Sequence, residues 1–152
     1  EITNWDEVGG EDGEILVTSR DSSSGTFGYF KKRVVQLDGT VKENNYTPDA
    51  LYLVSTVSIR EEVSINKNAI GYIGLGYLDD SVKAVNIIGE DATEGVKPSI
   101  ENIQNGSYPI SRQLFIYISE KDLTDLGEAF LEYVTGKEGQ EIARGIGFVP
   151  ID

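Results

Sequence analysis

The stretch EILVTSRDSSSGTFGYF, residues 14–30, sets the fold expected for this chain. Its apolar run at residues 15–17 predicts a buried strand, which ends near Ser19 and Arg20. A loop of small hydroxyl residues follows, and apolar residues at helical spacing then predict a helix that begins near Ser24. The stretch therefore predicts a strand, a tight loop and the N-terminus of a helix.

The predicted helix start is suited to bind an oxyanion. A first helical turn leaves about four N–H groups without intrahelical partners and carries the positive end of the helix dipole. Ser24 and Thr26 place hydroxyl groups on both sides of Gly25, whose missing side chain lets an anion approach the backbone. Arg20 lies just upstream and can donate two parallel hydrogen bonds. The candidate anion site is therefore Arg20, Ser24, Gly25 and Thr26.

The same residues also have a purely structural interpretation. Serine and threonine are favoured helix caps, glycine is common in loops, and an arginine beside an aspartate is usually a surface ion pair. Ser-Gly-Thr is a short pattern with many accidental matches. The spacing alone leaves both interpretations open.

Charge excludes one class of partner. The chain of 152 residues has 13 Lys and Arg against 26 Asp and Glu, a formal net charge of -13. Such a balance repels nucleic acid, and no basic stripe interleaved with aromatic residues offsets it. Any anion site must therefore act through local N–H groups, hydroxyls and Arg20. No nucleic-acid partner is expected.

The absence of two residue types excludes several chemistries. The sequence has no Cys and no His, so it cannot form a disulfide, a thiolate nucleophile, a histidine-based triad or a conventional zinc site. Acidic pairs at residues 79–80 and 90–91 lack the alternating oxygen ligands of a twelve-residue calcium loop. Neither a metal nor a cofactor is expected.

Periodicity along the rest of the chain predicts alternating strands and helices. The glycine-rich segment at 69–77 is predicted as a strand whose backbone closely approaches another segment, since no helix follows in the register of a dinucleotide-binding loop. Helices are expected near 24–37, 55–65, 93–104, 121–134 and 137–146, and further strands at 82–88 and 114–118. This order predicts an α/β fold, with ligands bound at strand-to-helix loops.

Several segments taken together resemble one family, the phosphate-binding substrate receptors of bacterial and archaeal phosphate ABC importers. The matching segments are ITNW (2–5), SR (19–20), SGT (24–26), NAIGY (68–72), GSYPISR (106–112), GQ (139–140) and GFVP (147–150). Each is weak alone, but they occur in the family's order along nearly the whole chain.

The resemblance implies a periplasmic-binding-protein-like lobe of α/β class, with a mixed sheet flanked by helices. Residues 1–109 would form the second, phosphate-binding lobe, and residues 110–152 a hinge-crossing strand and C-terminal helices that normally return to the first lobe. The first lobe, with the carboxylate that accepts the proton of hydrogen phosphate, would be largely absent. Arg20, Ser24, Gly25 and Thr26 would be this lobe's share of the phosphate site.

The function implied is non-catalytic binding of inorganic phosphate for a membrane permease. Its location would be extracytoplasmic, either periplasmic or at the cell surface, and the resemblance is compatible with a lipid-anchored precursor. One departure concerns Arg20: many relatives carry an acidic residue two positions later, where this chain has Ser22, so Asp21 is a candidate substitute.

Two other functions remain as alternatives. One is a surface or adhesive α/β module without phosphate transport. The other is a phosphate-ester hydrolase with Ser24 as nucleophile. It is disfavoured because the sequence has no His, and no Lys or carboxylate is spaced from Ser24 as the general base of a catalytic motif would be.

Overall fold

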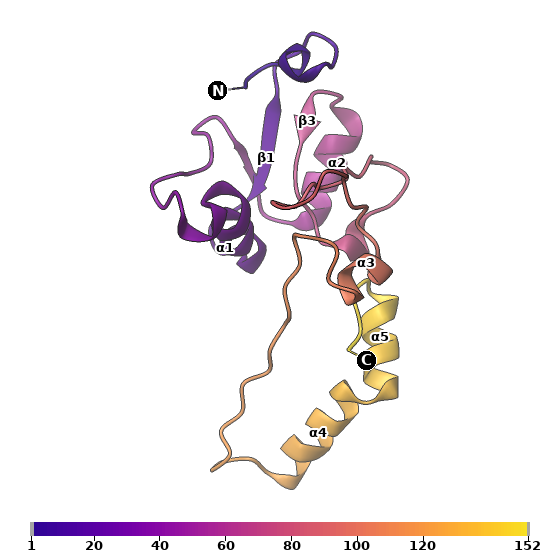
Figure 1. Ribbon diagram of the computed structural model, residues 1–152. Helices are drawn as coiled ribbons and strands as arrows, with labels where there is room; N and C mark the ends of the chain where they lie inside the picture. The colour runs from indigo at the N-terminus through magenta and orange to yellow at the C-terminus, as the bar shows by residue number, and fades with distance from the viewer. Residues whose placement is uncertain (1, 152) are drawn as a thin grey trace. The chain divides into compact units, whose positions relative to one another are not determined.

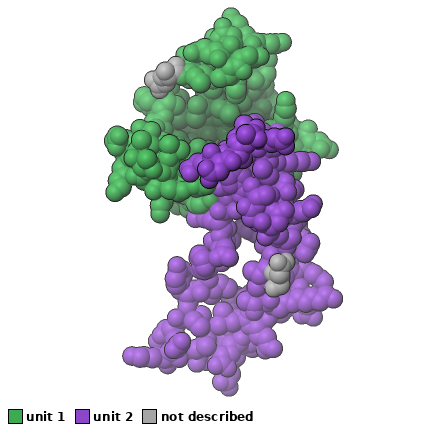
Figure 2. Space-filling model, in the orientation of Figure 1, with its two compact units in different colours: residues 1–83 green, residues 84–152 purple. Residues whose placement is uncertain are grey.

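The computed structural model describes residues 2–151. The chain divides into two compact units, Glu1–Lys83 and Ala84–Asp152 (Figure 2). The lobe boundary expected near residue 109 remains a prediction about the complete protein. Each unit is described by itself below.

The first unit is built on a parallel sheet. Its strands are β1 (Leu16–Arg20), β2 (Leu51–Leu53) and β3 (Ala69–Ile70), in the spatial order β2-β1-β3. Thr18 pairs with Leu51 on one side of β1, and Leu16 pairs with Ala69 on the other. The α/β class is confirmed, and the strands are all parallel rather than mixed.

Two helices connect these strands. α1 (Gly25–Phe30) continues directly into a π-helix (Lys31–Val35) on the way to β2, and α2 (Thr56–Ile65) leads from β2 to β3. The path runs outward from β1 to one neighbour and then back across β1 to the other. Because such crossovers are right-handed, the reversal places the two helices on opposite faces of the sheet. Figure 1 shows α1 and α2 on different sides of β1.

The reversal makes the carboxyl end of β1 a topological switch point. In open α/β sheets ligands bind where the connections from neighbouring strands leave in opposite directions. Arg20 is the last residue of β1 and therefore lies at this position. The fold thus places the candidate anion site where the architecture favours a ligand.

A small core holds β1 and α2 together. Ile59 of α2 and both Thr18 and Ser19 of β1 are fully buried. A Cβ atom on Gly71 would overlap Thr18 Oγ1 and lie 2.7 Å from Ile59 Cγ2. The close backbone approach predicted for the glycine-rich segment is therefore confirmed at Gly71, although the strand ends at Ile70.

The N-terminal segment is attached to the same sheet. A capping box between Asn4 and Glu7 caps the N-terminus of a 3-10 helix (Trp5–Val8). The indole Nε1 of Trp5 donates a 2.9 Å hydrogen bond to the carbonyl of Asn68, just before β3. Backbone donors at Thr3 and Asn4 lower the pKa of the Glu7 carboxyl. Trp5 therefore has a structural role, since it attaches this segment to the residue before β3.

In the second unit, the described residues up to 151 form three helices, α3 (Ile100–Gln104), α4 (Asp125–Thr135) and α5 (Lys137–Gly145). α3 and α4 start later than predicted because each begins at a side-chain cap. Ser99 accepts a hydrogen bond from Asn102 N, and Thr124 accepts one from Gly127 N.

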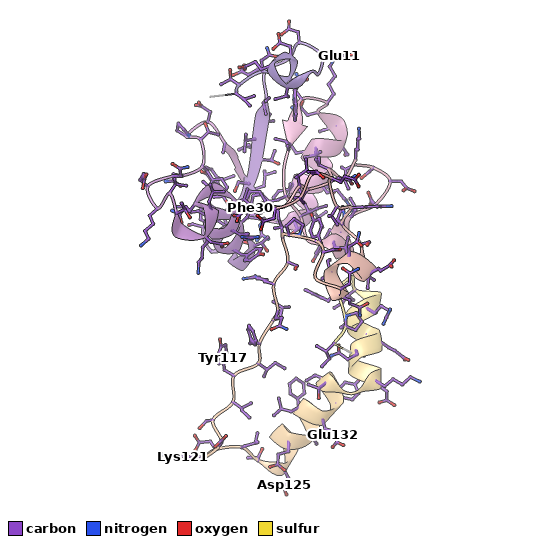
Figure 3. All side chains as sticks on the ribbon, viewed as in Figure 1. Glu11, Phe30, Tyr117, Lys121, Asp125 and Glu132 are labelled. Atoms are coloured by element: carbon purple, nitrogen blue, oxygen red, sulfur yellow. The ribbon has the colours of Figure 1, made fainter. Side chains whose placement is uncertain are left out.

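Two predicted strands do not form. The segment at 82–88 contributes only an isolated bridge between Ile87 and Val96, and the segment at 114–118 has no regular structure. All five residues at 114–118 are at least half exposed, and Tyr117 is 91% exposed (Figure 3). A strand requires a neighbouring strand to satisfy its backbone N–H and C=O groups, and the described residues offer none here.

Among residues 2–151, the helices are all too short or too polar to cross a bilayer.

Candidate functional site

The loop between β1 and α1 brings the predicted site residues together. Arg20 ends the strand, Ser24 is the N-cap of α1, and Gly25 and Thr26 are the first two helical residues. Two backbone hydrogen bonds hold the loop: Asp21 N donates to Leu53 O at 3.2 Å, and Ser24 N donates to Asp21 O at 3.1 Å. The helix therefore begins immediately beside the end of β1, as the sequence predicts.

Ser24 caps the helix with its side chain. Its Oγ accepts hydrogen bonds from Thr26 N at 3.2 Å and Phe27 N at 3.4 Å. A hydroxyl that accepts from two N–H groups keeps its own proton free to donate. Among the hydrogen bonds of the described residues there is none from the Gly25 N–H. Capping by Ser24 and donation to an anion are therefore compatible.

Arg20 provides the positive charge of the site. Its side chain is only 19% exposed. Nη1 donates a 3.2 Å hydrogen bond to Thr56 Oγ1, and Nη2 lies 3.8 Å from Asp21 Oδ2. Within the described chain, Nε is the one buried side-chain donor that has no partner. A buried N–H without an acceptor costs about 1–3 kcal/mol, so this edge of the guanidinium favours an added acceptor.

Asp21 replaces the acidic partner of the arginine only in part. Its Oδ1 accepts hydrogen bonds from the backbone N and the hydroxyl of Ser23, which leaves Oδ2 for the ion pair with Arg20. The Ser23 hydroxyl and N–H, and next the Arg20 charge, lower the pKa of the Asp21 carboxyl. Asp21 therefore stays ionised beside Arg20, but the hydrogen bond that orients the guanidinium comes from Thr56.

Three hydroxyl groups, those of Ser19, Tyr72 and Tyr46, form a hydrogen-bonded series next to the site, called the hydroxyl chain below. Ser19 Oγ donates to Arg20 O at 3.1 Å and lies 2.7 Å from Tyr72 Oη, which lies 3.1 Å from Tyr46 Oη. Tyr46 Oη donates to Phe27 O at 3.1 Å. The hydroxyl chain therefore connects the backbone of Arg20, at the end of β1, to the backbone of Phe27 in α1.

Aromatic rings surround these hydroxyls. The ring of Tyr72 stacks on Phe30 of α1 with centroids 4.0 Å apart, and Tyr46 packs against Phe27 at 4.9 Å. Burial, and next the hydrogen bond with Tyr72, raise the pKa of Tyr46 above its usual value. Tyr46 thus remains protonated in the neutral pH range.

Sequence reasoning missed Thr56, Tyr72 and Tyr46. A signal existed for Thr56, because it begins the helix after β2, and the carboxyl ends of parallel strands meet at one edge of a sheet. Tyr72 follows β3 at that same edge. Tyr46 lies outside the helices and strands that the sequence predicts, and its contact with α1 gave no local signal.

No cluster suited to a metal occurs among residues 2–151: the described carboxylates form no group of three or more that could hold an ion.

Comparison with known proteins places the chain in a family. Residues 1–138 match the model of the PBP superfamily domain, and the chain belongs to that superfamily. It is 34% identical over 153 residues to the phosphate-binding protein PstS of Borreliella burgdorferi, an alignment that covers 99% of this chain and 54% of that protein. The chain spans about half the length of the curated relatives it matches.

Solved structures agree with this assignment. One, described as a phosphate ABC transporter substrate-binding protein with bound phosphate from Clostridium perfringens, is 33% identical with a TM-score of 0.78, over 99% of this chain and 58% of that one. A phosphate-binding protein of a phosphate ABC transporter from Streptococcus pneumoniae is 37% identical with a TM-score of 0.75, over 90% and 51%. The resemblance to PstS-type phosphate receptors is confirmed.

Proposed function

We propose that this chain is the phosphate-binding second lobe of a substrate receptor for an ABC-type phosphate importer, and that it binds inorganic phosphate without catalysis. The observation that carries the proposal is the buried Nε of Arg20, a donor without a partner beside the start of α1. The names of the relatives and the bound phosphate in the Clostridium perfringens structure support the choice of ligand.

The proposed contacts use the groups that remain free in the site. Arg20 donates from Nε and supplies the charge, the Ser24 hydroxyl donates its proton, and the Gly25 N–H and the Thr26 hydroxyl complete the set. Charge-assisted hydrogen bonds of this kind are short and roughly twice as strong as neutral ones. Four donors from one strand end and the adjacent helix start are a set suited to a tetrahedral oxyanion.

The other half of the site is proposed to come from the missing first lobe of the receptor. Support comes from the share of the relatives' length that the chain covers, and from the apolar side chains that the second unit exposes at 114–118. In the full receptor a first-lobe carboxylate would accept the proton of hydrogen phosphate. Sulfate has no proton at neutral pH, so this acceptor would be left unpaired at a cost of about 1–3 kcal/mol.

A membrane permease is the proposed protein partner, and the proposed location is extracytoplasmic. Both follow from the PstS-type relatives rather than from a contact in this chain.

Catalysis by Ser24 finds no support in the site. A serine nucleophile requires a base that takes its proton. The contacts of Ser24 Oγ among the described residues are with N–H donors, Thr26 N and Phe27 N, and with no base. Binding without covalent chemistry is therefore the proposed activity.

Calorimetric titration of phosphate and then sulfate tests the proposal, with the unmodified protein and with Arg20→Ala. The 152-residue chain alone should bind weakly with poor selectivity, and the receptor completed with its first lobe should bind phosphate tightly and select it over sulfate. Arg20→Ala should abolish the heat in both. Tight, selective binding by the chain alone would contradict the assignment of the proton acceptor to the first lobe, and binding unaffected by Arg20→Ala would overturn the site.

A further inference from the structure

The hydroxyl of Tyr72 contacts both the strand that carries Arg20 and the tyrosine that bonds to α1. It lies 2.7 Å from Ser19 Oγ and 3.1 Å from Tyr46 Oη, and it accepts a long 3.4 Å hydrogen bond from Arg20 N. Ser19 in turn donates to the carbonyl of Arg20. The backbone N–H and C=O of Arg20 are therefore both attached, directly or through one hydroxyl, to Tyr72.

The protons of these hydroxyls can be assigned. Ser19 gives its only proton to Arg20 O, and Tyr46 gives its only proton to Phe27 O. The single proton of Tyr72 must then go to Ser19 or to Tyr46, and the shorter contact, 2.7 Å, is the one to Ser19. Tyr72 is thus the middle member of the hydroxyl chain, because its hydroxyl lies within hydrogen-bonding distance of both Ser19 Oγ and Tyr46 Oη.

Burial makes the middle member difficult to replace. Ser19 is fully buried, so in the unmodified protein its Oγ bonds to protein groups and not to bulk water. The ring of Tyr72 is fixed independently by its stack on Phe30 of α1. The position of the hydroxyl is therefore set by packing, while the hydroxyl itself sets the position of the Arg20 backbone.

We propose that Tyr72 is a positioning residue of the phosphate site: its hydroxyl, through Ser19 and Tyr46, fixes the Arg20 backbone relative to α1, so that Arg20 and the helix start meet the same anion. This inference rests on the proposed function for its consequence in binding. The geometric part, a coupling of Arg20 to α1, stands on the hydrogen bonds alone.

The test uses Tyr72→Phe, which keeps the ring and its stack on Phe30 and removes only the hydroxyl. The matched control is Tyr52→Phe. The centroid of the Tyr52 ring lies 6.4 Å from the ring centroids of both Phe27 and Tyr46, but its hydroxyl is not a member of the hydroxyl chain. Two measurements are made: amide hydrogen exchange at Arg20 by NMR in the 152-residue chain, and phosphate titration in the completed receptor.

Tyr72→Phe should speed amide exchange at Arg20 by about tenfold and weaken phosphate binding by a similar factor, as expected for one lost hydrogen bond. Tyr52→Phe should change neither. Unchanged Arg20 exchange in Tyr72→Phe would overturn the proposal, and faster exchange with unchanged phosphate affinity would show that Tyr72 has only a structural role. If the unmodified receptor binds no phosphate, the proposed function fails, and the exchange measurement still decides whether Tyr72 holds Arg20.

Discussion

Arg20 at the end of β1 and Thr56 at the start of α2 are joined by a 3.2 Å hydrogen bond from Nη1 to Oγ1. These residues belong to neighbouring parallel strand-to-helix connections, and Arg20 pairs in register with Leu53 of β2. The Thr56 hydroxyl therefore contributes the hydrogen bond that orients the guanidinium.

Thr56→Val tests this contact. Valine has nearly the same shape but cannot accept the hydrogen bond, so Nη1 loses its partner and the guanidinium can turn. Phosphate affinity of the completed receptor should fall by about threefold to tenfold, the worth of one modest hydrogen bond. Thr40→Val, at an exposed residue, is the control. Equal affinities in the two variants would show that Thr56 does not orient Arg20.

Arg20→Lys tests whether the planar guanidinium is needed or only its charge. Lysine keeps the positive charge but has no equivalent of the buried Nε, and it presents donors as a point charge rather than a fork. Phosphate affinity should fall by about tenfold to a hundredfold, which corresponds to a charged hydrogen bond of about 1.5–3 kcal/mol. Calorimetry measures the change. Arg60→Lys, at an arginine paired with Asp79, should bind as the unmodified protein does.

Gly71→Ala tests the close approach between the end of β3 and the core. The added Cβ would meet Thr18 Oγ1 and Ile59 Cγ2, both in fully buried residues that cannot move freely. The free energy of unfolding, measured with urea, should fall by about 1–3 kcal/mol. Gly28→Ala is the matched control: its Cβ meets nothing within 4 Å, and a helical alanine there should raise stability by about 0.5–1 kcal/mol. A loss in Gly28→Ala or a gain in Gly71→Ala would contradict the packing described.

Alkaline pH should destabilise the first unit through Tyr46. Burial raises the pKa of this phenol in the folded state above the value of about 10 in the unfolded chain. The folded state therefore keeps a proton that the unfolded state loses, so the contribution of Tyr46 is complete below about pH 10 and is lost as pH rises beyond it. Unfolding measured across this range should show a fall in stability that Tyr46→Phe reduces. An absorbance titration near 295 nm should show one late-ionising tyrosine that is missing in the same variant.

The exposed apolar segment at 114–118 should promote self-association of the isolated chain. Leu114, Phe115, Ile116, Tyr117 and Ile118 are consecutive, β-prone and uncharged, which is typical of sequences that pair with other strands. Ile116→Lys should reduce binding of a hydrophobic dye and reduce the sedimentation of larger species. Ile65→Lys removes a single isoleucine that is 82% exposed at the end of α2, and should change both much less. A chain that is monomeric at high concentration would contradict this prediction.

Local signals in the sequence were sufficient for the elements of the first unit that carry the site. A strand at Leu16–Arg20, a serine cap at Ser24 and a helix from Gly25 follow from a short apolar run, a hydroxyl residue and helical spacing, each a property of a few adjacent residues. The strands expected at 82–88 and 114–118 were wrong because an apolar run shows only a tendency, whereas a strand also needs a partner within reach.

The sequence by itself determined the α/β class, the strand-loop-helix that carries Arg20, Ser24, Gly25 and Thr26, and the exclusion of cysteine and histidine chemistry. Only the tertiary structure decided which residues support that loop. Thr56, Tyr72 and Tyr46 lie 36, 52 and 26 residues from the partners they bond, namely Arg20, Arg20 and Tyr72. Contacts over such separations depend on strand order, which short-range periodicity does not encode, because it arises from how the whole chain buries its apolar surface.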